Sequence, residues 1–73
     1  MKSVVGVDLG GTKTVAALVE PDGTRGPAVQ AATPAADGPG AVLDVVAALV
    51  REAAGEAEIG GVGIGTAGIV NGA

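Results

Sequence analysis

The stretch Asp8-Leu9-Gly10-Gly11-Thr12-Lys13-Thr14 is the part of the sequence that decides how the rest is interpreted. It lies between two short β-branched apolar runs, residues 3–9 and 14–19, which predict two strands joined by a tight turn. Because glycine has no Cβ, the backbone of this turn can take φ > 0, and another atom can approach the main chain closely. Uncovered amides in a glycine turn form a concave donor patch that suits phosphate, and the neighbouring hydroxyl and ammonium groups add to it.

The acidic residue before the turn extends this interpretation to a metal ion. Asp8 ends the first predicted strand and offers the hard oxygen ligand that Mg²⁺ carried by a nucleotide prefers. The residues predicted to bind a magnesium–nucleotide are Asp8, Gly10, Gly11, Thr12 and Lys13. A plain hairpin stays open as the alternative, because Gly-Gly is common in hairpins and Thr-Lys is ordinary on an edge strand.

Two better-known phosphate motifs do not fit the sequence. Gly6 and Gly11 have the glycine spacing of a P-loop, but Thr12 follows Gly11, so Lys13 comes one position late. A P-loop also requires a helix after the glycines, where this sequence predicts a strand. Residues 63–68 match Gly-x-Gly-x-x-Gly, but neither the helix nor the later acidic residue of the dinucleotide fingerprint follows them.

The composition predicts a single, incomplete domain. The 73-residue chain has no Phe, Trp or Tyr, so its core must come from Val, Ala, Leu and Ile, which bury less area than aromatic side chains. A chain of this size buries only about 60% of its unfolded surface. Its fourteen glycines add conformational entropy that folding must overcome. We therefore expect residues 1–73 to be part of a larger fold.

Charge and residue types exclude several classes of function. The net charge of −4 argues against nucleic acid or an anionic membrane as a partner. The absence of cysteine and histidine excludes a disulfide framework, a zinc site of thiolates or imidazoles, and an imidazole base. The first apolar segment is too short for a signal peptide, and no run approaches the ~20 apolar residues of a membrane span. We expect a soluble, cytoplasmic protein.

The first part of the chain is predicted to form a three-stranded antiparallel meander. Apolar residues on both faces of residues 3–9 indicate a strand that is covered on both sides. Pro21-Asp22-Gly23-Thr24 is a strong turn signal, because proline presets φ and glycine takes the left-handed position. A third strand is predicted over residues 26–32, weakened by Pro27, which cannot donate to a ladder.

A helix is predicted over residues 41–54, where apolar residues recur at three- and four-residue spacing and form one stripe for packing on the sheet. The stripe consists of Val42, Val45, Val46, Leu49 and Val50. Asp37 or Gly38 is the expected N-terminal cap, and Gly55 is the expected stop.

The glycine-rich segment at residues 60–68 is predicted to begin with a strand. A strand that follows a crossover helix lies parallel to an earlier one, and the natural neighbour is the strand at residues 3–9. This pairing would bring the segment from Gly65 to Gly68 to the same sheet edge as Asp8 and the glycine turn. Ligands bind at the carboxyl ends of parallel strands, so we expect a crevice there.

Two segments together resemble a known family. Val7-Asp8-Leu9-Gly10-Gly11-Thr12-Lys13-Thr14 and Gly61-Val62-Gly63-Ile64-Gly65-Thr66-Ala67-Gly68-Ile69-Val70-Asn71, separated by the meander and the helix, resemble the start of an ROK-family sugar kinase. The resemblance implies the α/β, ribonuclease H-like fold of an actin-like ATPase half-domain, with the chain as its N-terminal portion. It also implies ATP and Mg²⁺ as cofactors and a hexose as substrate.

The resemblance assigns roles to residues of this chain. It implies that Asp8 lies near the Mg²⁺ of the nucleotide. The residues that correspond to the first phosphate-binding turn are Gly10, Gly11, Thr12 and Lys13. It implies that Ala67 and Gly68 belong to a loop near the sugar. Members of the family place the catalytic aspartate beyond the position where this chain ends, so we expect residues 1–73 to be inactive alone.

Two other functions stay open at this point. A ROK-type transcriptional regulator has a sugar-sensing domain that resembles the kinases, but a winged helix-turn-helix precedes it, whereas only seven residues precede Asp8 here. The second alternative is a non-catalytic module that forms a homo-oligomer through the unpaired edge of its last strand.

Overall fold

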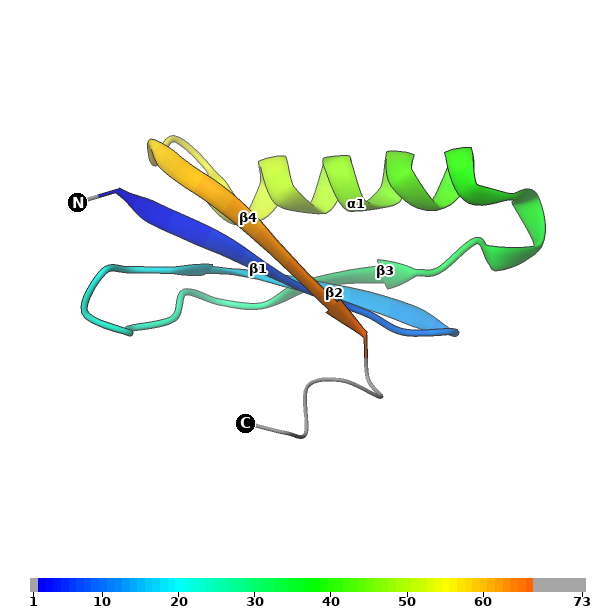
Figure 1. The fold of residues 1–73 in the computed structure, drawn as a ribbon, viewed down its shortest axis with the longest axis horizontal. Coiled ribbons are helices and arrows are strands. Elements are labelled where there is room, and N and C mark those ends of the chain that lie inside the picture. Colours follow the sequence, from blue (N-terminus) through cyan, green and yellow to red (C-terminus); the bar gives the residue numbers. More distant parts are fainter. Residues whose placement is uncertain (1, 67–73) are drawn as a thin grey trace.

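The computed structural model describes residues 2–66, which form one four-stranded sheet with an α-helix packed on one of its faces (Figure 1). The elements in chain order are β1 (Ser3–Leu9), β2 (Lys13–Val19), β3 (Val29–Ala32), the 3-10 helix η1 (Ala35–Asp37), α1 (Pro39–Ala54) and β4 (Ile59–Thr66). The strand order is β3-β2-β1-β4; β1 pairs antiparallel with β2 and parallel with β4, and β2 pairs antiparallel with β3. The predicted meander, crossover helix and parallel fourth strand are therefore confirmed.

The third strand is shorter than predicted, because β3 begins at Val29 rather than at Gly26. Pro27 has no N–H to donate to a ladder. The Gly26 N–H donates instead to the C=O of Leu18 at 2.8 Å, which ties this part of the connection to β2 outside the regular β3 pairing. Regular pairing resumes only after the proline.

The turn between β2 and β3 is built as predicted at residues 21–24. The Gly23 N–H donates to the C=O of Glu20 at 2.9 Å, and Gly23 has φ 93°, a left-handed conformation that glycine reaches without strain. The carboxylate of Asp22 accepts the Thr24 N–H at 2.9 Å, and this hydrogen bond holds the pKa of Asp22 below its ordinary value.

The helix α1 begins two residues earlier than predicted, at Pro39. Gly38 is the N-cap, so Asp37 does not cap the helix. Pro39 takes the first helical position, where the backbone N–H has no acceptor within the helix and its absence in proline costs no hydrogen bond. Gly55 ends the helix as predicted, with φ 57° and its N–H donating to the C=O of Arg51 at 3.1 Å. Within residues 2–66, no helix has both the length and the apolar character needed to cross a membrane.

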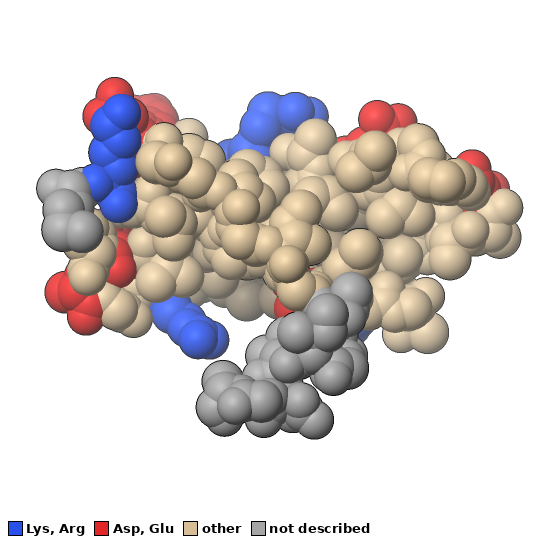
Figure 2. All heavy atoms as spheres, viewed as in Figure 1, with Lys and Arg blue, Asp and Glu red and all other residues tan. Residues whose placement is uncertain are grey.

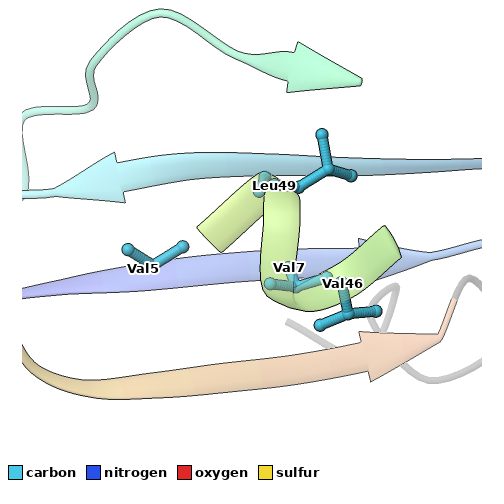
Figure 3. Close-up of a cluster of buried hydrophobic side chains, with 5 residues drawn as sticks. Val5, Val7, Val46 and Leu49 are labelled. Carbon is cyan, nitrogen blue, oxygen red and sulfur yellow. The ribbon is translucent and has the colours of Figure 1, made fainter. Parts of the chain in front are cut away.

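The hydrophobic core lies between α1 and the sheet (Figure 3). Val5 and Val7 of β1 point toward the helix, because side chains two apart on a strand share a face. Val46 and Leu49, from the predicted apolar stripe, are buried against them, and Ala16 of β2 completes the cluster. The assignment of the stripe to packing on the sheet is therefore confirmed.

The opposite face of the sheet is not covered within residues 2–66. Val4, whose side chain alternates with those of the core, is 42% exposed there. The prediction that β1 is covered on both sides is therefore wrong for this part of the chain, because α1 packs on one face only. On the helix face, Val62 and Ile64 of β4 are also 45% and 55% exposed, because α1 packs mainly over β1, β2 and β3.

The core assignment predicts unequal effects for two leucines on α1. Leu49→Ala is expected to lower the free energy of unfolding by about 2–4 kcal/mol, because it removes a buried side chain and leaves a cavity. Leu43→Ala is the matched control: this leucine is 64% exposed, so its truncation is expected to change stability by about 0.5 kcal/mol or less. Urea unfolding followed by circular dichroism measures both, and equal effects would contradict the observed core.

Candidate phosphate-binding turn

The turn between β1 and β2 is closed by a single pair of backbone groups. The Gly10 N–H donates to the C=O of Lys13 at 3.0 Å, which leaves Gly11 and Thr12 as the two residues at the tip. Both are exposed, and within residues 2–66 neither of their amides donates a hydrogen bond. Two adjacent uncovered N–H groups form the kind of donor patch that binds an anion.

The two glycines of the turn have different physical roles. Neither has a positive φ, so of the two possibilities that glycine opens here, the turn does not use the left-handed conformation. At Gly10 the close approach is the reason: an added Cβ would lie 2.8 Å from the carbonyl oxygen of Lys13. At Gly11 an added Cβ would meet nothing within 4 Å. Packing within residues 2–66 therefore requires glycine at position 10 and does not require it at position 11.

The parallel pairing of β1 with β4 brings the second glycine-rich segment to the turn. Asp8 is paired with Gly65 and Leu9 with Thr66, so the two strands end at the same edge of the sheet. The predicted position of Gly65 beside Asp8 is therefore confirmed. The other predicted loop residues, Ala67 and Gly68, lie outside the described residues.

Asp8 and Lys13 supply the charges on either side of the turn, and both side chains are exposed. The Asp8 side chain lies on the sheet face opposite α1, because its strand neighbour Val7 points toward the helix. Among residues 2–66, no group of three or more His, Cys, Asp or Glu side chains gathers to hold a metal ion. A lone carboxylate fits Mg²⁺ that arrives with the phosphates of a nucleotide and keeps them as ligands.

A hollow of about 430 Å³ extends from Asp8 over the uncovered face of the sheet. Its floor is made of residues without side chains or with small ones, among them Gly6, Ala17, Gly63 and Gly65. Arg25 also lines it and was not predicted from the sequence. It reaches this face through an isolated bridge with Val19, and no local sequence signal marks such a contact.

Comparisons with known proteins agree with the fold. A family model described as the ROK family matches residues 4–73. Glucokinases from Streptomyces coelicolor and Streptomyces lividans are 41% identical to the chain over 71 residues, a match that covers 97% of this chain and 22% of each relative. The crystal structure of a ROK family glucokinase from Streptomyces griseus in complex with glucose and AMPPNP has a TM-score of 0.79 and 34% identity. That match covers 89% of this chain and 20% of the neighbour.

These matches establish the fold class, but they cover only a small part of each relative. The mixed sheet with its crossover helix is the α/β, ribonuclease H-like fold of an actin-like ATPase half-domain, as predicted. The chain spans about a fifth of the length of the relatives that it matches.

The difference between the two glycines yields a paired prediction. Gly10→Ala is expected to destabilise the chain by about 1–3 kcal/mol, because its Cβ would clash with the carbonyl oxygen of Lys13. Gly11→Ala is expected to leave stability within about 1 kcal/mol of the parent. It is nevertheless expected to weaken binding of Mg–AMPPNP, because it adds a methyl group to the tip of the turn, where a phosphate group must approach the backbone closely. Urea unfolding and a nucleotide titration measure the two effects. Unchanged nucleotide affinity in Gly11→Ala would contradict the site.

Proposed function

The chain belongs to the ROK family, and from that membership we propose that its glycine turn binds the phosphate groups of ATP in a sugar kinase. The observation that carries the proposal is the pair of amides at Gly11 and Thr12, which have no acceptor among residues 2–66, beside an exposed Asp8 at the carboxyl end of two parallel strands. The Streptomyces griseus neighbour was solved with glucose and AMPPNP, which supports a hexose and ATP as the substrate classes. The reaction would transfer a phosphoryl group from Mg–ATP to a hexose hydroxyl.

In this proposal each residue of the turn has a distinct task. The Gly11 and Thr12 amides and the Thr12 hydroxyl donate hydrogen bonds to phosphate oxygens, and Lys13 contributes a positive charge. Gly10 does not bind phosphate through its N–H, which is hydrogen-bonded to the carbonyl of Lys13; its role is to allow the tight turn. Asp8 orients Mg²⁺, which when bound neutralises charge on the phosphates. The Ala67–Gly68 segment is proposed to lie near the sugar.

We also propose that the chain does not catalyse phosphoryl transfer alone. Transfer requires a base positioned on the accepting hydroxyl together with a clamp on the γ-phosphate. Asp8 lies near the end of β1, beside the phosphate turn, a position that fits metal binding better than proton abstraction. The chain would then be the N-terminal portion of an actin-like ATPase domain, with a sugar and ATP, and no nucleic acid, as ligands in the cytoplasm. Its net charge of −4 agrees with the absence of nucleic acid as a partner.

The edge of the sheet supports a second proposal, self-association through β4. This strand, Ile-Gly-Gly-Val-Gly-Ile-Gly-Thr, contains neither the charged residues nor the proline that usually protect an edge. Uncharged atoms cover the middle of the molecule in Figure 2, in the view in which β4 lies in front. An antiparallel pair of two β4 strands centred on Gly63 would place Val62 of one copy opposite Ile64 of the other. Both are half-exposed on the same face, so the pair would bury them together.

The nucleotide proposal predicts binding without turnover. Titration of the chain with Mg–AMPPNP is expected to show binding that Asp8→Ala weakens about tenfold or more, the scale of losing a contact to a charged group. Asp44→Ala, which removes an exposed carboxylate on α1, is the matched control and is expected to bind like the parent. A coupled assay with glucose and Mg–ATP is expected to show no product. Equal binding by parent and Asp8→Ala would remove the metal role of Asp8, and turnover would refute the claim of inactivity.

The edge proposal predicts a dimer in solution, measured by light scattering. Ile64→Lys is expected to give a monomer, because it places a charge on the pairing edge. Leu43→Lys, at a more exposed position on α1, is the control and is expected to leave the dimer intact. A monomeric parent at all accessible concentrations would contradict the proposal.

A further inference from the structure

A pair of hydroxyl groups, one of them on a fully buried side chain, lies directly behind the phosphate turn. Thr14, the second residue of β2, is fully buried on the face of the sheet that packs against α1. Its ladder neighbours Leu9 and Ala31 are apolar and pack against the core. The Thr14 hydroxyl is 2.8 Å from the hydroxyl of Thr33, nineteen residues later in the chain.

Packing alone does not explain this pair. A buried hydroxyl without a partner destabilises a fold, whereas a hydroxyl that finds one contributes only modestly to stability. Valine has nearly the shape of threonine and would fill the same space between Leu9 and Ala31 without needing a partner. The hydrogen bond between the Thr14 and Thr33 hydroxyls therefore fixes where the segment after β3 lies relative to β2, and it adds little to the stability of the core.

The backbone of Thr33 makes a second contact, with the turn itself. Its N–H donates to the C=O of Thr12 at 3.0 Å, and its own C=O accepts the N–H of Ala35 at 2.9 Å. Thr33 follows the last residue of β3, so the segment that leaves this strand holds the turn at residue 12 and at residue 14. A carbonyl oxygen held by Thr33 cannot rotate toward an anion bound at the tip.

We infer that Thr33 is a positioning residue for the phosphate turn: it fixes the peptide between Thr12 and Lys13 and, through the hydroxyl of Thr14, the start of β2, so that the tip that carries the Gly11 and Thr12 amides keeps its conformation. The inference rests on the proposed function, because it takes phosphate as the ligand of those amides. Thr33 itself touches no ligand in this account and acts through Thr12 and Thr14.

The experiment compares substitutions that separate position from stability. Thr33→Val leaves the buried Thr14 hydroxyl without its partner, and the double variant Thr14→Val/Thr33→Val removes both hydroxyls while keeping the shape of the core. Thr33→Ser keeps a hydroxyl at the contact. Thr24→Val, in the turn that follows β2, is the matched control. For each variant, urea unfolding, the ¹⁵N order parameters of the Gly11 and Thr12 amides, and the affinity for Mg–AMPPNP are measured.

The double variant gives the decisive result. Its urea midpoint is expected to return close to that of the parent, while the order parameters of both amides fall and nucleotide affinity weakens about five- to tenfold. Thr33→Ser is expected to keep the order parameters and the affinity of the parent. If the double variant keeps both properties, Thr33 is only a structural partner of Thr14 and the inference is overturned.

Failure of the proposed function can be told apart from failure of this inference. If the parent chain itself does not bind Mg–AMPPNP, the phosphate role of the turn is wrong, and the order parameters alone decide whether Thr33 holds it. If the double variant does not fold, Thr33→Val and Thr33→Ser decide the same question by their order parameters, which are expected to fall in the first and to stay unchanged in the second.

Discussion

The hydrogen bond from the Gly10 N–H to the C=O of Lys13 is the contact on which the rest of this structure depends. It joins β1 to β2 with only two residues between the paired groups, and the chain can make it because residue 10 has no side chain to meet the Lys13 carbonyl oxygen. This hydrogen bond uses the Gly10 N–H and the Lys13 C=O at the base of the hairpin. The amides of Gly11 and Thr12 are left at the tip with no acceptor among residues 2–66, and the site follows from that.

The parallel pairing of β4 with β1 adds the second part of the site. Through the crossover by α1, Gly65 arrives beside Asp8 at the end of the sheet, and as a glycine it places no side chain on that flank of the carboxylate. The same helix packs its apolar stripe on one face of the sheet; on the other face, within residues 2–66, lies the hollow whose lining is mostly glycine, alanine and valine. One crossover helix thus both stabilises the sheet and determines which face carries Asp8.

Much of this fold could be predicted from the sequence because its signals are local. The β-branched run that became β1, the turn at residues 21–24 and the stop at Gly55 each depend on residues close together in the chain. The start of β3 could be predicted only in part: Pro27 marks the weak point, but the pairing of the Gly26 N–H with the C=O of Leu18 outside the regular ladder is a feature of the folded chain. The separate roles of Gly10 and Gly11 depend on where a carbonyl oxygen lies in space. The contributions of Arg25 and Thr33 depend on tertiary placement, so no spacing in the sequence marks them.

The central claim is that the Gly11 and Thr12 amides at the tip of the turn contact phosphate, and amide chemical shifts on addition of Mg–AMPPNP test it most directly. The account predicts large shifts for the Gly11 and Thr12 amides, and none for Gly23, a glycine in the opposite turn whose N–H is already bonded to the C=O of Glu20. Shifts that leave Gly11 and Thr12 unmoved while the chain binds the nucleotide would contradict the account, because the ligand would then occupy some other surface.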